Sequence, residues 1–202
     1  LILHFRIQSS HPELYDKMAD TLYETLENRM LGKKYSYEYF GKNLGQVPLR
    51  DLTEKVIIIV DRNTDLLGET ALDEYVNLCS NSMYMRALTS DQVEFNHDVD
   101  ELTEYNKKQM TIVLPNLSAK PQSPSSALAM TYGCQFVAMA FQAMDDNVQY
   151  NALFFDEAGS AFALKPAHLR YVPVTVKVPD PPPAEYSFGT RQVKTDYYSF
   201  DI

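Results

Sequence analysis

Residues 132–142, Tyr-Gly-Cys-Gln-Phe-Val-Ala-Met-Ala-Phe-Gln, carry the strongest indication of the fold class. As a strand it would carry apolar side chains on both faces, which is typical of a parallel sheet wrapped by helices. The amides of Gln135 and Gln142 would then need hydrogen-bond partners at the rim of that sheet. The stretch therefore predicts an α/β fold, either a barrel or a doubly wound sheet.

Outward from this stretch, strand patterns alternate with helix patterns. Residues 56–60 predict the clearest buried strand, because all five are β-branched. Further strands are predicted over residues 1–5, 83–88, 110–114 and 162–166. Between them we expect a short helix or turn over 71–78, a solvated helix over 98–104 and an amphipathic segment over 148–155. Polar loops are expected over 61–65 and 118–126.

The first helix has the most detailed pattern. Ser10-His11-Pro12-Glu13 has the form of a capping box with a proline near the first helical position. An apolar stripe at a spacing of four predicts that a helix follows and that Gly32 ends it. The stripe consists of Leu14, Met18, Leu22, Leu26 and Met30.

Composition and charge narrow the range of functions. The 202 residues include 18 basic and 27 acidic ones, for a formal net charge of -9. This charge argues against a nucleic-acid partner and against electrostatic docking on an anionic bilayer. No apolar run is long enough for a transmembrane segment.

Cys79 and Cys134 lie in apolar surroundings, which predicts buried free thiols in a reducing, intracellular compartment. Because the chain opens as if inside a strand, we expect it to be part of a longer protein.

Residues 133–142, followed by Ala-Leu-Lys-Pro-Ala-His-Leu-Arg at 163–170, resemble the Y-box of eukaryotic-type phosphoinositide-specific phospholipase C. Residues 106–111 and Pro115 resemble the strand that precedes it in that family. Residues 1–31 and 49–60 resemble the end of the X-box. The resemblance implies the closing part of a TIM-type (β/α)8 barrel over residues 1–171, with the X-box ending at 61 and the Y-box at 70–171. Residues 172–202 are expected to form an extended, Pro- and Tyr-rich arm.

The resemblance also shows which catalytic groups are missing. The family's reaction uses paired histidines, a calcium ion held by carboxylates, and basic residues on the ring phosphates. Its calcium-binding glutamate falls at Arg6 or Ile7. Its phosphate-binding lysines fall within Ile59-Val60-Asp61, and its arginine and ring-stacking tyrosine fall at Ile112 and Leu114. We therefore assign no catalytic residue and no metal ligand. The family's serine falls near Asn81 or Ser82, which are the only candidate substrate-binding residues.

The histidines offer little support for catalysis. Ser9-Ser10-His11 imitates the family's catalytic Ser-Ser-His sequence, but that sequence belongs on the first barrel strand, well upstream. His11 is better explained as part of a helix start. His4, His97 and His168 have structural explanations, and no Cys/His spacing indicates zinc.

Two hypotheses of different classes follow. The first is a catalytically inactive phospholipase-C-like barrel with a structural or interaction role, without a cofactor. Residues 73–77 and 157–162 resemble the phospholipase-C-like proteins of large DNA viruses, which would make it a virion component. The alternative is an active phosphoinositide phosphodiesterase whose histidines and calcium ligands lie in an N-terminal half. A lipid-head-group binding module is disfavoured by the acidic charge. Expected partners are the rest of the barrel and protein neighbours that contact the arm.

Overall fold

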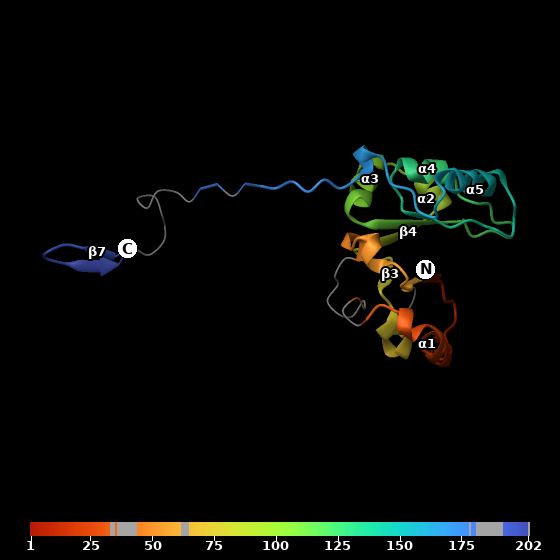
Figure 1. The fold of residues 1–202 in the computed structure, drawn as a ribbon, viewed down its shortest axis with the longest axis horizontal. Coiled ribbons are helices and arrows are strands. Elements are labelled where there is room, and N and C mark those ends of the chain that lie inside the picture. The colour runs from red at the N-terminus through yellow and green to blue at the C-terminus, as the bar shows by residue number, and fades with distance from the viewer. Residues whose placement is uncertain (33–34, 36–43, 62–64, 178, 181–191, 202) are drawn as a thin grey trace. The chain divides into compact units, whose positions relative to one another are not determined.

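The computed structural model describes residues 1–32, 35, 44–61, 65–177, 179–180 and 192–201. It consists of two compact units, Leu1–Tyr171 and Val172–Ile202 (Figure 1). The first unit contains the segments that resemble the barrel.

Six strands of the first unit form two parallel sheets. One has the order β1 (Ile2–Phe5), β2 (Ile57–Asp61) and β3 (Leu78–Ser80). The other has the order β4 (Met85–Thr89), β5 (Met110–Leu114) and β6 (Phe136–Val137). The α/β class with parallel sheets is thereby confirmed, and strands that are neighbours in the sequence are neighbours in space. The described strands do not close into a barrel.

Helices connect and cover these strands. The α-helices are α1 (Pro12–Leu26), α2 (Ser90–Glu94), α3 (Val99–Lys108), α4 (Ser126–Thr131) and α5 (Asp146–Ala158). Short 3-10 helices are Glu27–Arg29, Leu44–Gln46, Leu49–Leu52, Asp65–Glu69, Ala71–Tyr75 and Ala167–Leu169. None of these helices is both long and apolar enough to cross a membrane.

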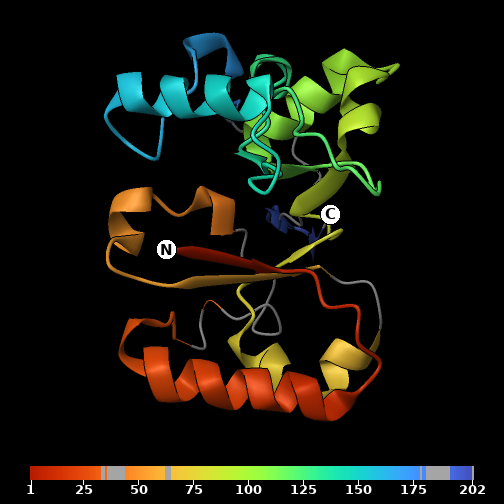
Figure 2. The same cartoon turned by 90° about the vertical axis from the view of Figure 1, so that its right-hand side faces the viewer.

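The core has an inner and an outer part because side chains alternate along each strand. The inner cluster joins both sheets and contains Ile57, Ile59, Leu78, Met85, Ile112 and Leu114. One outer cluster packs α1 against the opposite faces of β1 and β2, and Figure 2 shows that helix running alongside these strands. A second outer cluster joins Val113 to Val93 of α2 and Ala129 of α4. This layering explains why strand residues 56–60 are apolar throughout.

The first helix departs from its predicted ends. Pro12 is the first helical residue as expected, but the N-cap is His11, and no side chain caps it. Ser9, not Ser10, bonds the His11 amide through its hydroxyl, so the capping box is wrong. The helix ends at Leu26 and a 3-10 turn follows, well before Gly32. Tyr15, Ala19 and Leu22 are buried, whereas Leu14 is exposed, so the buried stripe lies one position away from the predicted one at the helix start.

Two strand predictions also need correction, and one strand was not predicted. Residues 133–142 contain only the two-residue strand β6, and Val137 and Ala138 are half-buried. Residues 162–166 form no strand. The buried strand β3 was not predicted, and only its first residue, Leu78, lies in the segment expected to be a short helix or turn. The strands predicted over 83–88 and 110–114 are confirmed as β4 and β5. Residues 33–34, 36–43 and 62–64 lie outside the described residues.

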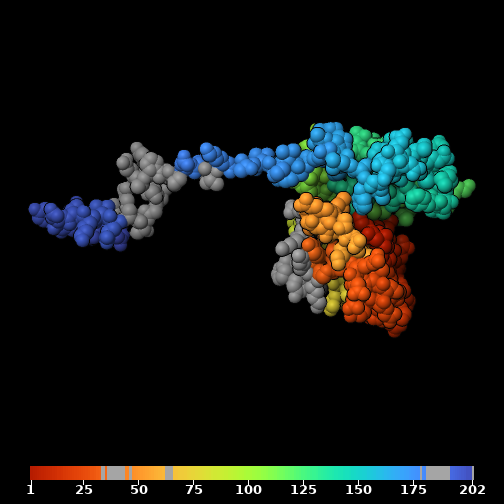
Figure 3. Space-filling model, in the orientation of Figure 1, coloured from red at the N-terminus to blue at the C-terminus, as the bar shows by residue number. Residues whose placement is uncertain are grey.

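The second unit contains more regular structure than an extended arm. Residues 172–177 have no regular structure and are exposed, as expected. Beyond them β7 (Gln192–Lys194) and β8 (Ser199–Asp201) pair as an antiparallel hairpin, which corrects the prediction for this end of the arm. On the first unit, α5 lies at the surface with most of its residues exposed or half-buried (Figure 3, cyan).

Candidate functional site at the carboxyl ends of β1, β2 and β3

A row of polar side chains continues the inner face of the first sheet. Ile2 of β1 and Ile57 and Ile59 of β2 face the inner core. Because every second residue shares a face, His4 and Arg6 continue the row of Ile2, and Asp61 continues that of Ile59. Asp61 is paired in register with Ser80 of β3. The carboxyl ends of these parallel strands therefore bring four polar residues to one edge of the sheet, the edge at which α/β folds place their functional sites.

The centre of this polar cluster is an ion pair. Arg6 Nε donates to Asp61 Oδ2 at 2.9 Å. The Asp61 side chain is 1% exposed and that of Arg6 is 36% exposed. Ser80 Oγ donates to Asp61 Oδ1 at 3.2 Å, and Asn81 Nδ2 donates to the same oxygen at 2.9 Å. The buried carboxylate is thus paired with a cation and hydrogen-bonded on both oxygens, as a buried charge must be.

His4 completes the cluster. Its Nε2 lies 3.3 Å from Ser80 Oγ, so the two side chains form a hydrogen bond. Burial lowers the pKa of His4 below its ordinary value of 6.5; the negative charge of Asp61 opposes this effect and the positive charge of Arg6 adds to it. The imidazole is therefore neutral near pH 7 and does not supply a second cation.

The two candidate substrate-binding residues are occupied by contacts within the chain. Asn81, in the left-handed region at φ 62°, bonds Asp61 with its amide nitrogen and accepts from the Ala87 amide with its oxygen at 3.3 Å. Ser82 Oγ accepts from the Tyr84 amide at 3.3 Å. Asn81 therefore belongs to the polar cluster and Ser82 to the turn before β4. The hydrogen bonds of Asn81 and Ser82 therefore stabilise the fold of the chain itself.

The other positions aligned by the resemblance are apolar and packed. Ile112 and Leu114 are buried in the inner cluster. Ile7 packs against the outer cluster under α1, which leaves Arg6 as the residue on the inner face. Sequence reasoning missed His4 and Ser80 as members of the cluster. The signal that could have found them is the alternation that places His4 two residues before Arg6, and Ser80 at the end of an apolar strand.

The polar cluster does not fit calcium. Calcium requires six to eight oxygen ligands, usually with several carboxylates. Here the carboxylate is paired with a guanidinium. The described part of the chain contains no group of three or more His, Cys, Asp or Glu residues that could hold a metal ion. Both carboxylate oxygens of Asp61 already accept hydrogen bonds from side chains of the same chain.

A second polar network surrounds the start of β6 and answers the question raised by the glutamines. Gln135 Nε2 donates to the carbonyls of Asn106 and Gln109, both at 2.8 Å. Gln135 Oε1 accepts from the Thr111 amide at 2.8 Å. The prediction of a glutamine bonded at the sheet rim is confirmed for Gln135, whereas Gln142 is exposed. Gln135 connects α3, β5 and β6.

Lys165, near the C-terminal end of the first unit in the sequence, belongs to the same hydrogen-bond network. Its Nζ donates to the Asn106 carbonyl at 2.8 Å, in the last turn of α3, where a cation is favoured. Burial lowers the pKa of Lys165 to about 8. Burial also raises the pKa of the neighbouring Cys134 thiol to about 11. Both cysteines are buried and free, as predicted.

A comparison with known protein families gives a match over the segment that contains this second network. Residues 70–168 match the family described as phosphatidylinositol-specific phospholipase C, Y domain. This match supports a phospholipase-C Y-box in that segment, which includes Asn81, Asn106, Gln135 and Lys165. The Y domain belongs to a family of TIM-type barrels. A search of curated proteins returned no match.

Proposed function

We propose that this chain is part of a phospholipase-C-like barrel that does not hydrolyse phosphoinositides and that acts as a structural or interaction module. The single observation that carries the proposal is the Arg6–Asp61 ion pair. The resemblance aligns Arg6 with an anionic calcium ligand and places Asp61 within the segment of the phosphate-binding lysines. Both charges are thus reversed, and the two side chains neutralise each other.

The energetics of binding support loss of activity. A multiply anionic head group needs unpaired Lys or Arg side chains to replace its hydration. Among the described residues at this edge of the sheet, the cation is Arg6, and it is already bonded to a carboxylate. The buried Ile112 and Leu114 provide neither charge nor an aromatic face. Both the metal and the phosphates would therefore lack their main ligands.

The proposed partners follow from the edges of the two sheets. Within the described residues, β1 pairs only with β2 and β6 only with β5. We propose that the upstream part of the same barrel completes both sheets. We also propose that the second unit, with Tyr197, Tyr198 and Phe200 exposed, contacts a protein neighbour. A place in a virion remains a prediction, since no relative supports the viral resemblance.

The test is a lipase assay on the full natural chain. We expect no calcium-dependent release of head group from vesicles that contain phosphatidylinositol or its bisphosphate. Asp61→Asn serves as the matched variant, because it keeps the shape of the side chain while removing its charge. A preparation with a cooperative thermal transition would show that the protein assayed is folded.

One outcome would establish the alternative hypothesis. Calcium-dependent turnover by the wild-type chain would contradict the proposal outright. If Asp61→Asn abolished that turnover without loss of folding, Asp61 would be a replacement metal ligand and the ion pair would be part of an active site.

A further inference from the structure

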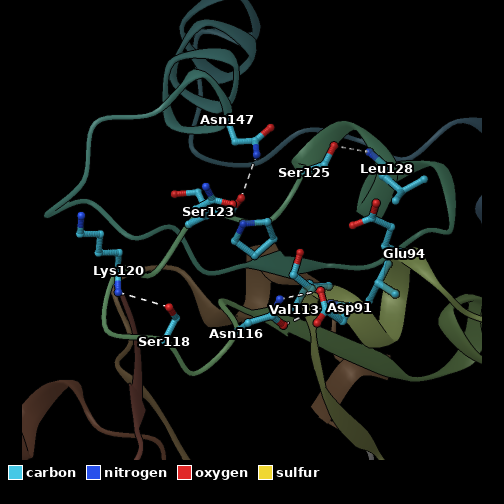
Figure 4. A pocket seen from close by; sticks show the side chains of 14 residues that line it. Asp91, Glu94, Val113, Asn116, Ser118, Lys120, Ser123, Ser125, Leu128 and Asn147 are labelled. Atoms are coloured by element: carbon cyan, nitrogen blue, oxygen red, sulfur yellow. Dashed lines mark hydrogen bonds between the residues drawn. The ribbon is translucent and has the colours of Figure 1, made fainter.

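The first unit contains a second concave region, separate from the polar cluster. It is a hollow of about 690 Å³ bounded by α2, the loop that follows β5 and the start of α4 (Figure 4). None of its lining residues belongs to the polar cluster. Val113 forms part of its floor and faces the outer cluster, so the hollow lies on the helix side of the second sheet. Its volume lies within the range of small-molecule sites.

Hydrogen bonds between distant segments fix the walls of this hollow. The Asp91 amide donates to Asn116 Oδ1 at 3.2 Å, and Asn116 Nδ2 donates back to Asp91 Oδ1 at 2.6 Å. Asn147 Nδ2 donates to the Ser123 carbonyl at 2.8 Å. The Ser123 hydroxyl accepts from the Ala140 amide at 3.0 Å. The shape of the hollow is therefore set before any ligand arrives, which reduces the entropy cost of binding.

Other lining groups retain hydrogen-bonding capacity. Glu94 contributes a carboxylate, Lys120 an ammonium and Ser90 a hydroxyl, and none of these groups is used in the bonds that hold the walls. The proton of Ser118 Oγ is also available, since this oxygen only accepts from the Lys120 amide. Acceptors and donors thus line the hollow together with Leu128, which is half-buried, whereas the lining residues Val93 and Val113 are buried.

We infer that this hollow binds a neutral polyhydroxylated ring the size of a monosaccharide. A hydroxyl group donates and accepts at once, so a ring of hydroxyls satisfies carboxylates and an ammonium together. The less polar face of such a ring could pack against Leu128, the half-buried apolar side chain of the lining. Anionic ligands are disfavoured, because the lining contains two carboxylates, Asp91 and Glu94, and one ammonium, Lys120, in a chain of net charge -9. This inference goes beyond the proposed function and does not depend on it.

The test is titration of the full natural chain with free methyl glycosides of glucose, mannose and galactose, followed by NMR or calorimetry. We expect saturable binding of at least one glycoside, with a Kd on the order of 1 mM. Glu94→Gln and Lys120→Met should each weaken it about tenfold, since each removes a charge-assisted hydrogen bond. Both side chains are exposed, so both variants should fold.

Matched controls and a second source of the ligand complete the design. Glu157→Gln and Lys17→Met make the same changes at exposed positions outside the hollow and should leave Kd unchanged. Vesicles with and without a galactosyl lipid distinguish a free sugar from a lipid-borne one, and sugar-dependent capture would extend the inference to the latter. Absence of saturable binding to every glycoside, tighter binding of inorganic phosphate, or binding unaffected by both hollow variants would overturn the inference.

Discussion

At the scale of single residues, the ion pair with Arg6 stabilises the buried Asp61 carboxylate. The Asp61 side chain is almost completely buried and receives donors from Arg6, Ser80 and Asn81. A carboxylate in such a position is costly when a donor is removed, because water cannot reach it. Surface pairs have no such penalty.

We therefore expect Arg6→Met to lower the free energy of unfolding by about 1.5–3 kcal/mol, the usual value of a hydrogen bond to a charged group. Urea denaturation of the full natural chain measures it. Arg50→Met is the control, because Arg50 forms a 3.5 Å pair with Asp51 and is 86% exposed. Its effect should stay within about 0.5 kcal/mol. Equal losses in the two variants would mean that the Arg6–Asp61 pair has no special role.

The pKa values of Lys165 and Cys134 predict a characteristic pH profile. Lys165 titrates near 8 in the folded chain against 10.5 ordinarily, so between these values the unfolded chain holds more protons and stability rises with pH. Cys134 titrates near 11 against 9.0 ordinarily, so between these values the folded chain holds more protons and stability falls with pH. Between pH 8 and 9 only Lys165 acts, so the free energy of unfolding rises. Between pH 9 and 10.5 the opposite effects of Lys165 and Cys134 largely cancel, and between pH 10.5 and 11 Cys134 alone lowers the free energy of unfolding.

The free energy of unfolding measured by urea across this range should change shape in two variants. Lys165→Met should remove the rise between pH 8 and 9, and Cys134→Ala should remove the fall above 10.5. Comparison with the wild-type chain cancels the contributions of other groups. An unchanged slope between pH 8 and 9 in Lys165→Met would show that burial does not perturb this lysine.

At the scale of elements, β6 is held in place by backbone bonds to β5 and by side-chain bonds of Gln135. With only two residues, β6 offers few backbone bonds to β5. Gln135 supplies three further bonds, to α3 and to the region where α3 leads into β5. Gly133 precedes it at φ +73°, where an added Cβ would meet its neighbours at ordinary contact distances of 3.5 Å or more. Backbone conformation, and not crowding, is what requires glycine there.

Gln135→Met should therefore destabilise the unit by roughly 0.5–1.5 kcal/mol per lost bond. Protection of the Thr111 amide from hydrogen exchange should fall as well, because that amide donates to the Gln135 side chain. Gln142→Met provides the control, as Gln142 is exposed. If both substitutions had the same small effect, the amide network would not be what holds β6.

At the scale of the whole molecule, two sheets share one inner core, and within the described residues their outer strands have edges without strand partners. In the described residues, β1 and β6 each pair on one side only. Such edges present unpaired backbone groups, to which other chains can add strands. Completion by an upstream part of the barrel, as proposed above, would cover them.

Residues 1–202 expressed alone should consequently self-associate. Light scattering and sedimentation measure this, and addition of the upstream segment, linked or in trans, should suppress it. Removal of residues 172–202 provides a control, since this unit is compact by itself and the edges of β1 and β6 remain. A monomeric fragment with a cooperative melt would show that the open edges are already protected.

Elements with a local pattern of residues could be predicted from the amino-acid sequence. Five consecutive β-branched residues, 56–60, predict β2, and the mostly apolar residues 110–114 predict β5, because a strand buried on both faces is predominantly apolar. The resemblance carried by residues 106–170 was likewise readable in the sequence, and the match over 70–168 agrees with it. The opposite charges of Arg6 and Asp61 are also evident in the sequence, but the contact between the two side chains is not.

Contacts between residues that are distant in the sequence depend on the folded arrangement of the strands and could not be predicted. Arg6 and Asp61 are 55 positions apart, and His4 and Ser80 are 76 apart, so neither contact leaves a local pattern. The length of β6 was misjudged for the same reason: an apolar run forms a strand only where a neighbouring strand offers backbone partners, and β5 pairs with just two residues of it. Sheet register brings polar strand ends together, and that register depends on the packing of the whole unit.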